Sequence, residues 1–196
     1  MDRRQFLESI AGFSTLVPGL ALLPVAAQQA FAGELHARAR SAAALRTLTP
    51  AQDATLGSIA EILLPESDTV GARGVGVSRF IDLLLTEAML DAERDKFLAG
   101  LDAIGARSQA LYSAPVALAS REQQQSLVAA LDAHLPARAP TPAETRALAT
   151  APMTAERGYA TLKQLVVLAY FTSEPVARGL IKAPIIPGRY DGCVSA

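Results

Sequence analysis

The chain has 196 residues, a formal net charge of −1 and 51% hydrophobic residues. This length is enough for one domain with its own core, and the lack of a basic excess argues against nucleic acid as a partner. Aromatic residues make up only 5% of the chain and tryptophan is absent, while alanine and leucine dominate, so the composition favours helices over sheet.

The N-terminus carries the pattern of an export signal. Arg3 and Arg4 lie side by side and are followed by Phe6 and Leu7. A charged start before an apolar run is typical of a secretory signal, and the paired arginines indicate the bacterial twin-arginine route, which carries proteins that have already folded. We therefore predict a signal peptide over residues 1–32 and a site of action in the periplasm.

The apolar run continues over residues 10–27 and is followed by the small residues of an A-x-A cleavage site, Ala30 and Ala32. The alternative is an uncleaved anchor that faces lipid. Pro18 and Pro24 interrupt the run, which is also shorter than the ~20 continuous apolar residues that a spanning helix needs. The pattern therefore favours a cleaved signal.

The remaining residues, 33–196, are predicted to form a single domain, because helix signals follow one another and no strand-like alternation occurs. Residues 33–48 are polar and alanine-rich, which is typical of a short, frayed helix. Thr49 opens a capping box with proline at the first helical position, and an apolar stripe at helical spacing follows it. Pro65 ends this helix, and a long loop over residues 66–76 contains three glycines.

Further helices are predicted beyond this loop. One covers residues 77–89, and Asp91 is placed to cap the next, whose inward face repeats Phe97, Leu98, Leu101, Ile104 and Leu111. Ser120 and Thr141 open two more capping boxes. The last long helix covers about residues 154–170, and its apolar stripe on one side consists of Tyr159, Leu162, Val166, Ala169 and Tyr170. The fold class is therefore all-α, an irregular bundle of five or six helices with an extended C-terminal tail.

The C-terminal segment departs from the helical pattern. Ser173 is placed to cap a short restart, but two prolines exclude a helix from the tail, residues 183–196. Ile185 and Ile186 would be costly to leave exposed, so the tail docks on a partner, folds back on its own bundle, or does both. Cys193 is the only cysteine, and in an oxidising periplasm it is either a free thiol or is paired with another chain.

We identify no catalytic, cofactor-binding or metal-binding signature in the sequence. His36 and His134 are far apart and lack metal-type neighbours, so we expect them to be structural or surface residues. The glycines of residues 71–76 have the wrong spacing for a phosphate loop and are interpreted as turn formers. Arg73 is expected to pair with a carboxylate within that loop or across an interface. We expect the carboxylates near this loop, Glu61 among them, to cap it rather than to catalyse.

Three segments resemble the family called gluconate 2-dehydrogenase subunit 3. The first is residues 48–82, which contain LLPESDTVGARGVGVSRF. The second is LAYFTSE at residues 168–174, and the third is PGRYDGC at residues 187–193. They follow one another in the family's order, and the twin-arginine signal agrees with the resemblance.

The resemblance implies a small, non-catalytic subunit that exports, stabilises and docks a periplasmic sugar or polyol dehydrogenase. The large partner would be a flavoprotein of the glucose–methanol–choline oxidoreductase type, often with a cytochrome c subunit as electron acceptor. FAD is then expected in the partner and no cofactor in this chain. The complex also offers a route to association with the membrane.

Two regions are expected to contact the partner, and no catalytic residue is carried over. The expected contact residues are Tyr170, Phe171, Thr172, Ser173 and Glu174 at the helix break, and Ile185, Ile186, Pro187, Gly188, Arg189, Tyr190 and Cys193 in the tail, with a disulfide to the partner through the cysteine. The alternative function is a stand-alone periplasmic binding or scaffold protein. A neighbouring reading frame for a flavin oxidoreductase without its own signal would favour the accessory subunit.

Overall fold

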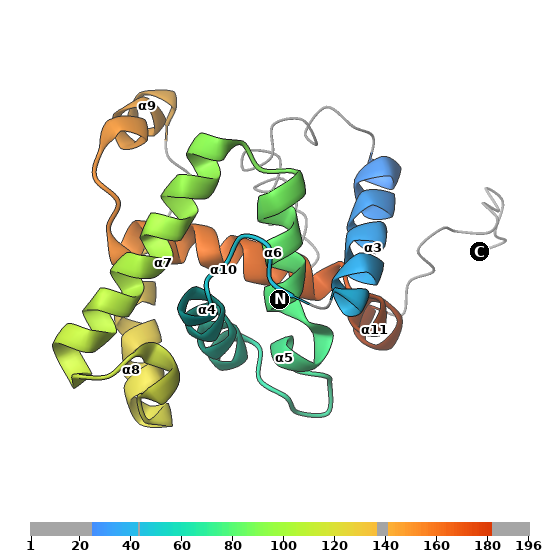
Figure 1. Ribbon diagram of the computed structural model, residues 1–196, viewed down its shortest axis with the longest axis horizontal. Helices are drawn as coiled ribbons and strands as arrows, with labels where there is room; N and C mark the ends of the chain where they lie inside the picture. The colour runs from blue at the N-terminus through green and yellow to red at the C-terminus, as the bar shows by residue number, and fades with distance from the viewer. Residues whose placement is uncertain (1–24, 43, 137–140, 182–196) are drawn as a thin grey trace, which may run out of the picture.

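The computed structural model describes residues 25–42, 44–136 and 141–181, and every regular element in these residues is helical (Figure 1). The all-α prediction is therefore confirmed, and the described residues form more helices than the five or six that the sequence predicts, the short α5 and α11 among them. The helices are α3 (Val25–Ser41), α4 (Pro50–Leu63), α5 (Ala72–Val75), α6 (Val77–Glu87), α7 (Asp91–Tyr112), α8 (Arg121–Asp132), α9 (Pro142–Thr150), α10 (Ala155–Phe171) and α11 (Glu174–Val176), with a 3₁₀ turn at Val116–Leu118 and a π-helical turn at Ala177–Ile181.

Three helices begin at the capping boxes that the sequence predicts. Before α4, the Gln52 amide donates to the Thr49 hydroxyl at 3.3 Å, and the Gln52 side chain accepts from the Thr49 backbone N–H at 3.0 Å. Ser120 and Thr141 make the same reciprocal pair at the starts of α8 and α9. Each cap is worth about 1 kcal/mol and favours a helix start at its own position.

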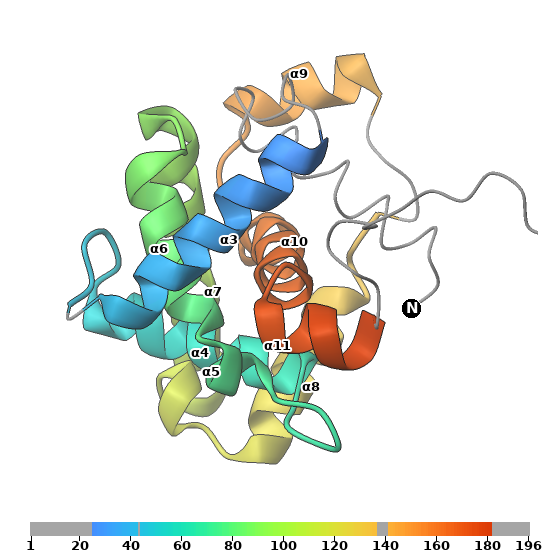
Figure 2. The same ribbon diagram turned by 90° about the vertical axis from the view of Figure 1, so that its right-hand side faces the viewer.

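Helix α10 is the centre of the bundle. The sequence predicts a stripe of inward-facing residues along it, and the structure buries these side chains completely at Tyr159, Leu162, Val166 and Ala169. The view along α10 shows α3, α6, α7, α4 and α8 arranged around it (Figure 2). A helix surrounded in this way is apolar on most of its circumference, which matches its sequence.

Helices α7 and α10 cross with their backbones in contact at Gly100 and Gly158. A Cβ atom on Gly158 would lie 2.5 Å from the Gly100 Cα, and one on Gly100 would lie 2.6 Å from the Gly158 Cα. No other residue type fits at this crossing, because real Cβ atoms do not approach backbone atoms so closely. Glycine inside a helix is about 1 kcal/mol less favourable than alanine. The close packing of α7 against α10 offsets this loss of helix stability.

Helix α7 differs from its prediction at both ends. Asp91 is the first residue of the helix and not its cap, since Leu90 occupies the cap position without a side-chain hydrogen bond. Leu111 was expected in the core, but its side chain is 57% exposed, because the last turn of this long helix lies beyond α10 (Figure 1). In the previous turn, the buried Ser108 hydroxyl donates to the Ala114 carbonyl at 2.9 Å.

The segment before residue 42 also differs from its prediction. Instead of a frayed, polar segment, α3 is a packed helix that buries Ala32, Leu35, His36 and Ala39. These residues recur at a spacing of three and four, but two of them are alanines and one is a histidine. The apolar stripe was therefore too weak to detect from composition alone.

Replacing Gly158 with alanine should destabilise the protein by at least about 1–3 kcal/mol, because the added methyl group meets backbone that cannot move aside. The matched control is Gly105→Ala on α7, where nothing lies within 4 Å of the added Cβ atom. That change should stabilise the helix by about 0.5–1 kcal/mol. Urea denaturation followed by circular dichroism measures both, and equal effects would contradict the close crossing.

Candidate functional site

Two of the segments that the sequence analysis singled out meet in space. The loop of residues 66–76 and the break at the end of α10 are joined by Tyr170, whose hydroxyl donates to the Val70 carbonyl at 2.8 Å. The Tyr170 ring is buried and stands edge-on to Phe171, with ring centroids 5.3 Å apart. We call the break at residues 170–175, together with the loop of residues 66–76 and the part of α3 that packs on the break, the α10–α11 junction.

The helix break has a local cause in residues 172–175. The Thr172 amide still donates to Leu168, but the Ser173 amide and hydroxyl both turn back to the Tyr170 carbonyl, at 3.2 and 2.7 Å. Pro175 lacks a backbone N–H group, and N–H groups in the first turn of a helix have no partner within the helix. Proline therefore fits the first turn of the new helix, which begins at Glu174. The sequence-based prediction of a break and restart at Ser173 is confirmed, although no Ser173 side-chain cap forms.

His36 fastens α3 to this junction. Its ring stacks on Phe80 with centroids 4.2 Å apart, and its Nε2 atom lies 3.1 Å from the Thr172 hydroxyl oxygen. That hydroxyl has one proton, which it donates to the Leu168 carbonyl at 2.8 Å, so it accepts from Nε2–H. Burial, with help from nearby Arg40, lowers the pKa of His36 from 6.5 to about 4. The expectation that this histidine is structural is confirmed.

The loop of residues 66–76 is held by Glu61 from α4. The Glu61 carboxylate accepts hydrogen bonds from the backbone N–H groups of Glu66, at 3.3 Å, and Arg73, at 3.1 Å. A Cβ atom on Gly71 would lie 2.6 Å from the Glu66 nitrogen, so glycine is required there. The carboxylate orders the loop, as predicted. Within the described residues, the backbone N–H of Arg73 and not its guanidinium meets this carboxylate. The alternative prediction, that Arg73 pairs with a carboxylate across an interface, stays a prediction.

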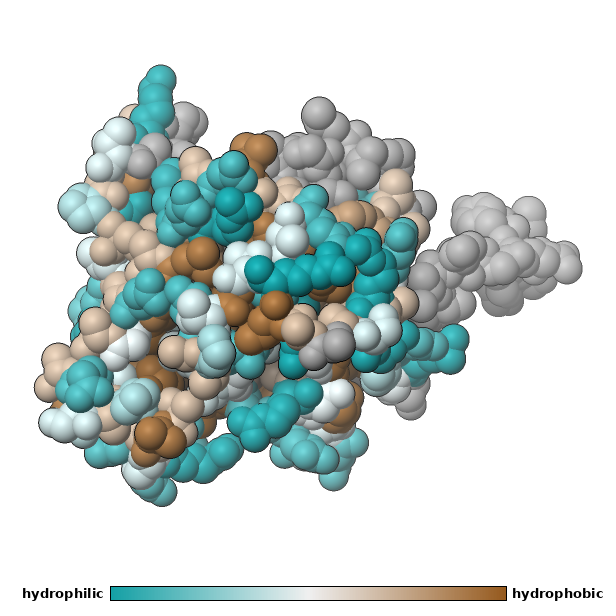
Figure 3. Space-filling view, in the orientation of Figure 1, coloured by the Kyte–Doolittle hydropathy of each residue, from teal (hydrophilic) through white to brown (hydrophobic). Residues whose placement is uncertain are grey.

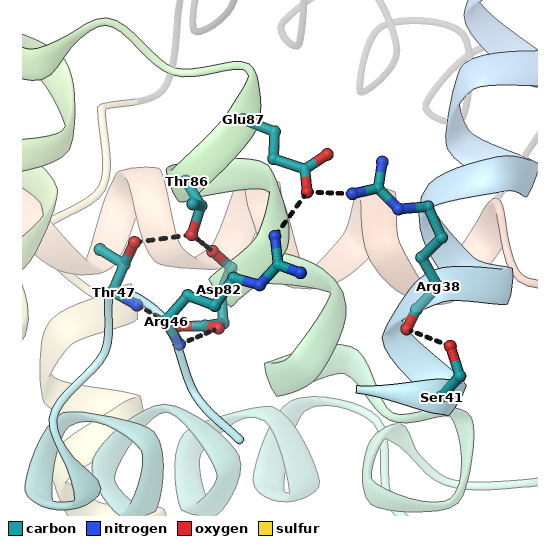
Figure 4. A network of polar contacts seen from close by, with 7 residues as sticks. All are labelled: Arg38, Ser41, Arg46, Thr47, Asp82, Thr86 and Glu87. Carbon is teal, nitrogen blue, oxygen red and sulfur yellow. Dashed lines mark hydrogen bonds and ion pairs between the residues drawn. The ribbon is translucent and has the colours of Figure 1, made fainter. Parts of the chain in front are cut away.

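A second carboxylate organises the connection from α3 to α4. Buried Asp82 on α6 accepts backbone hydrogen bonds from Arg46 and Thr47 at 2.8 and 2.9 Å (Figure 4). It accepts a third, at 2.8 Å, from the backbone N–H of Leu48. On the same helix, Glu87 forms ion pairs with Arg38 of α3 and with Arg46. The role of Asp82 is not visible in the sequence, because its partners lie 34–36 residues earlier and are backbone groups that leave no side-chain signature.

A third polar cluster lies between α8 and α10. Asp132 accepts from the Tyr159 hydroxyl at 2.7 Å and from the Lys163 ammonium at 2.6 Å. Burial opposes ionisation of Asp132, but these two hydrogen bonds outweigh it and lower the pKa of the carboxyl. Burial and the neighbouring carboxylate raise the pKa of Tyr159. The cluster joins two helices, and its groups are paired with one another.

The predicted contact residues differ in how far they reach the surface. Tyr170 and Ser173 are buried within the bundle, Phe171 and Thr172 are half-buried, and Glu174 is exposed. Of the predicted signal residues, Ala30 is exposed and Ala32 is buried, both within α3. The other predicted residues lie outside the described part of the chain, namely Arg3, Arg4, Phe6, Leu7, Ile185, Ile186, Pro187, Gly188, Arg189, Tyr190 and Cys193.

Two further properties concern the described residues as a whole. Among them, no three histidine, cysteine, aspartate or glutamate side chains come together as a group that could hold a metal ion. None of their helices is both long and apolar enough to cross a membrane. On the face seen in Figure 3, apolar residues form small, separate areas among polar ones.

The fold and these contacts define an all-helical domain whose buried polar groups hold its segments together. Residues 50–188 match the family described as Gluconate 2-dehydrogenase subunit 3, which is more than half of the chain, so the chain belongs to that family. Family membership implies an accessory role beside a larger dehydrogenase subunit. Neither the curated proteins nor the solved structures provided a match.

Changing Asp82 to asparagine should lower the free energy of unfolding by about 2–4 kcal/mol, because an NH₂ group would then face a buried backbone donor. The control is Glu87→Gln on the same helix. That change weakens only ion pairs at the surface and should cost less than about 1 kcal/mol. Thermal unfolding of both variants measures the difference, and similar losses would argue against the Asp82 clamp.

Stability should fall as the pH drops from 6.5 towards 4. The unfolded chain takes up a proton on His36 near its ordinary pKa of 6.5, whereas the folded chain resists protonation until about pH 4. The stabilisation is complete above pH 6.5, and on the order of 3 kcal/mol is lost across this window.

The variant that tests this dependence is His36→Gln, which keeps a donor for Thr172 but does not titrate. It should remove this contribution to the slope of stability against pH. The control variant His134→Gln changes the other, exposed histidine and should retain the slope. An unchanged slope in His36→Gln, measured by urea denaturation at several pH values, would mean that His36 is not the titrating group.

Proposed function

We propose that the chain is the non-catalytic small subunit of an FAD-dependent sugar or polyol dehydrogenase, and that it exports, stabilises and docks the large subunit. The observation that carries this proposal is the family match over residues 50–188. The arrangement of the polar groups supports it, because the carboxylates of Glu61, Asp82 and Asp132 are engaged in holding the fold. FAD and the sugar chemistry would belong to a partner of the glucose–methanol–choline type, with a cytochrome c as electron acceptor.

The α10–α11 junction is proposed as one contact region. Tyr170 and Ser173 would shape it from within, while Phe171 and Glu174 are more accessible to a partner. Glu174 pairs with Arg178 at 3.0 Å, in a position where both side chains remain largely exposed. The tail, residues 183–196, would extend the contact, and Cys193 would form a disulfide with the partner.

Export through the twin-arginine route is the other part of the proposal. The sequence Arg3-Arg4-Gln5-Phe6-Leu7 supports it, since this route carries folded proteins. A small subunit with this signal would bring a large subunit without a signal into the periplasm after the two have assembled. The flavin would then be bound before export, and association with the membrane would come through the complex.

Purification of the tagged full chain from the periplasm of its own host tests the proposal. A yellow flavoprotein should co-purify and oxidise sugars or polyols with an artificial electron acceptor. On non-reducing electrophoresis the two chains should migrate together, and Cys193→Ser should separate them. A colourless chain purified alone would contradict the proposal and favour a stand-alone binding or scaffold protein.

The contact region has its own test. Glu174→Arg reverses a charge at the junction and breaks the pair with Arg178, so it should reduce the amount of flavoprotein that co-purifies. The control is Asp95→Arg, an equal reversal at a 73% exposed side chain on α7. Equal yields from both variants would exclude Glu174 from the contact.

A further inference from the structure

The proposed signal boundary lies inside a folded helix. Helix α3 continues from Val25 to Ser41 across the bond between Ala32 and Gly33. Ala32 is 5% exposed, and Leu35, on the other side of the bond, is 1% exposed. The buried stripe of α3 therefore crosses the cleavage point without interruption.

Contacts on both sides of this bond hold α3 against the domain. Phe31, immediately before the predicted site, packs against the core. After the site, His36 stacks on Phe80 and donates to Thr172, and Arg38 forms an ion pair with Glu87. The bond lies about two turns inside the helix, further in than the terminal turn that usually frays.

A peptidase needs its substrate in an extended form, because the enzyme pairs with the same backbone groups that a helix uses internally. Cutting between Ala32 and Gly33 therefore requires α3 to leave the domain and unwind. Such local unfolding would expose Leu35 and break the His36 contacts. The probability of cleavage is set by how often this opening occurs.

We propose that folding closes the Ala32–Gly33 bond to signal peptidase, so that α3 stays whole in the working protein and any processing occurs N-terminal to Val25. The inference rests on the proposed function in one respect: export of a folded chain means that α3 has docked before a peptidase meets it. The boundary of the domain then moves from residue 33 to the start of α3.

The retained helix has a role at the α10–α11 junction. Cleavage before Gly33 would leave only residues 33–41 of α3, and so short a helix depends wholly on its tertiary contacts. The whole helix holds His36 on Thr172, next to the break proposed as a contact region. Keeping α3 intact therefore keeps the shape of that region.

Limited proteolysis of the purified full-length chain with elastase, which cuts after small residues such as alanine, tests the closure directly. Mass spectrometry should find no early cut after Ala30 or Ala32 in the native protein. In Leu35→Ser, which removes a buried anchor of α3, cleavage there should be at least about tenfold faster. Native protein cut as fast as this variant would overturn the proposal.

Two controls separate release of α3 from general unfolding. Glu34→Ser changes an exposed neighbour on the same helix and should remain protected. Cleavage after Ala169, which is fully buried in α10, reports global unfolding and should stay slow in all variants. If Leu35→Ser fails this second control, Arg38→Ala, which removes only the surface ion pair, takes its place and should show a smaller increase at Ala30 and Ala32.

N-terminal sequencing of the chain recovered from its host tests the consequence in the cell. Phe31 and Ala32 should still be present, and an N-terminus at Gly33 would overturn the proposal. The two proposals fail in different ways. A chain that stays in the cytoplasm contradicts the proposed export, whereas protection from elastase decides separately whether α3 closes the bond.

Discussion

The bundle depends on the contact between two helix backbones at Gly100 and Gly158. Because neither residue has a side chain, α7 and α10 approach until their main chains touch. This crossing brings α10 into the middle of the domain, where α3, α4, α6 and α8 can pack around it (Figure 2). The direction of α10 is then fixed, and the C-terminal end of the helix places Tyr170 against the loop of residues 66–76. The candidate site is therefore a consequence of a contact at the opposite end of the helix.

Charged and polar groups inside the domain mainly fix the paths of connecting segments. Asp82 gathers three backbone N–H groups before α4, and Glu61 gathers two in the loop after it. Hydrogen bonds to a charged group are worth about 1.5–3 kcal/mol each, enough to hold segments that have no helical pairing of their own. His36 and Tyr170 do the same for α3 and the α10–α11 junction. A domain built in this way presents a defined surface, which is what an accessory subunit of a dehydrogenase needs.

The sequence predicted the site as separate parts. It identified the break after Tyr170, the glycine-rich loop and the loop-capping role of Glu61, since turn residues and helix breakers act over a few positions. It also placed Tyr170 among the expected contact residues. In the structure the Tyr170 side chain is buried and its hydroxyl serves the fold. The link from His36 to Thr172 was out of reach, because 136 residues separate the two. One weak signal was available, the spacing of Ala32, Leu35, His36 and Ala39, but alanine and histidine give little hydropathy contrast.

Local sequence alone encodes the helical class, the capped helix starts and the inward stripe of α10. These features depend on hydrogen bonds and side-chain spacing within about one or two turns, so local residues suffice to encode them. The other features depend on contacts between helices that are distant in the sequence. Leu111 follows the right spacing but is exposed, because its turn extends beyond the partner helix. Gly100 and Gly158 carry no pattern that pairs them, and only the crossing makes them necessary. Long-range packing selects which of several locally acceptable faces is buried, and local sequence does not record where the neighbouring helix will lie.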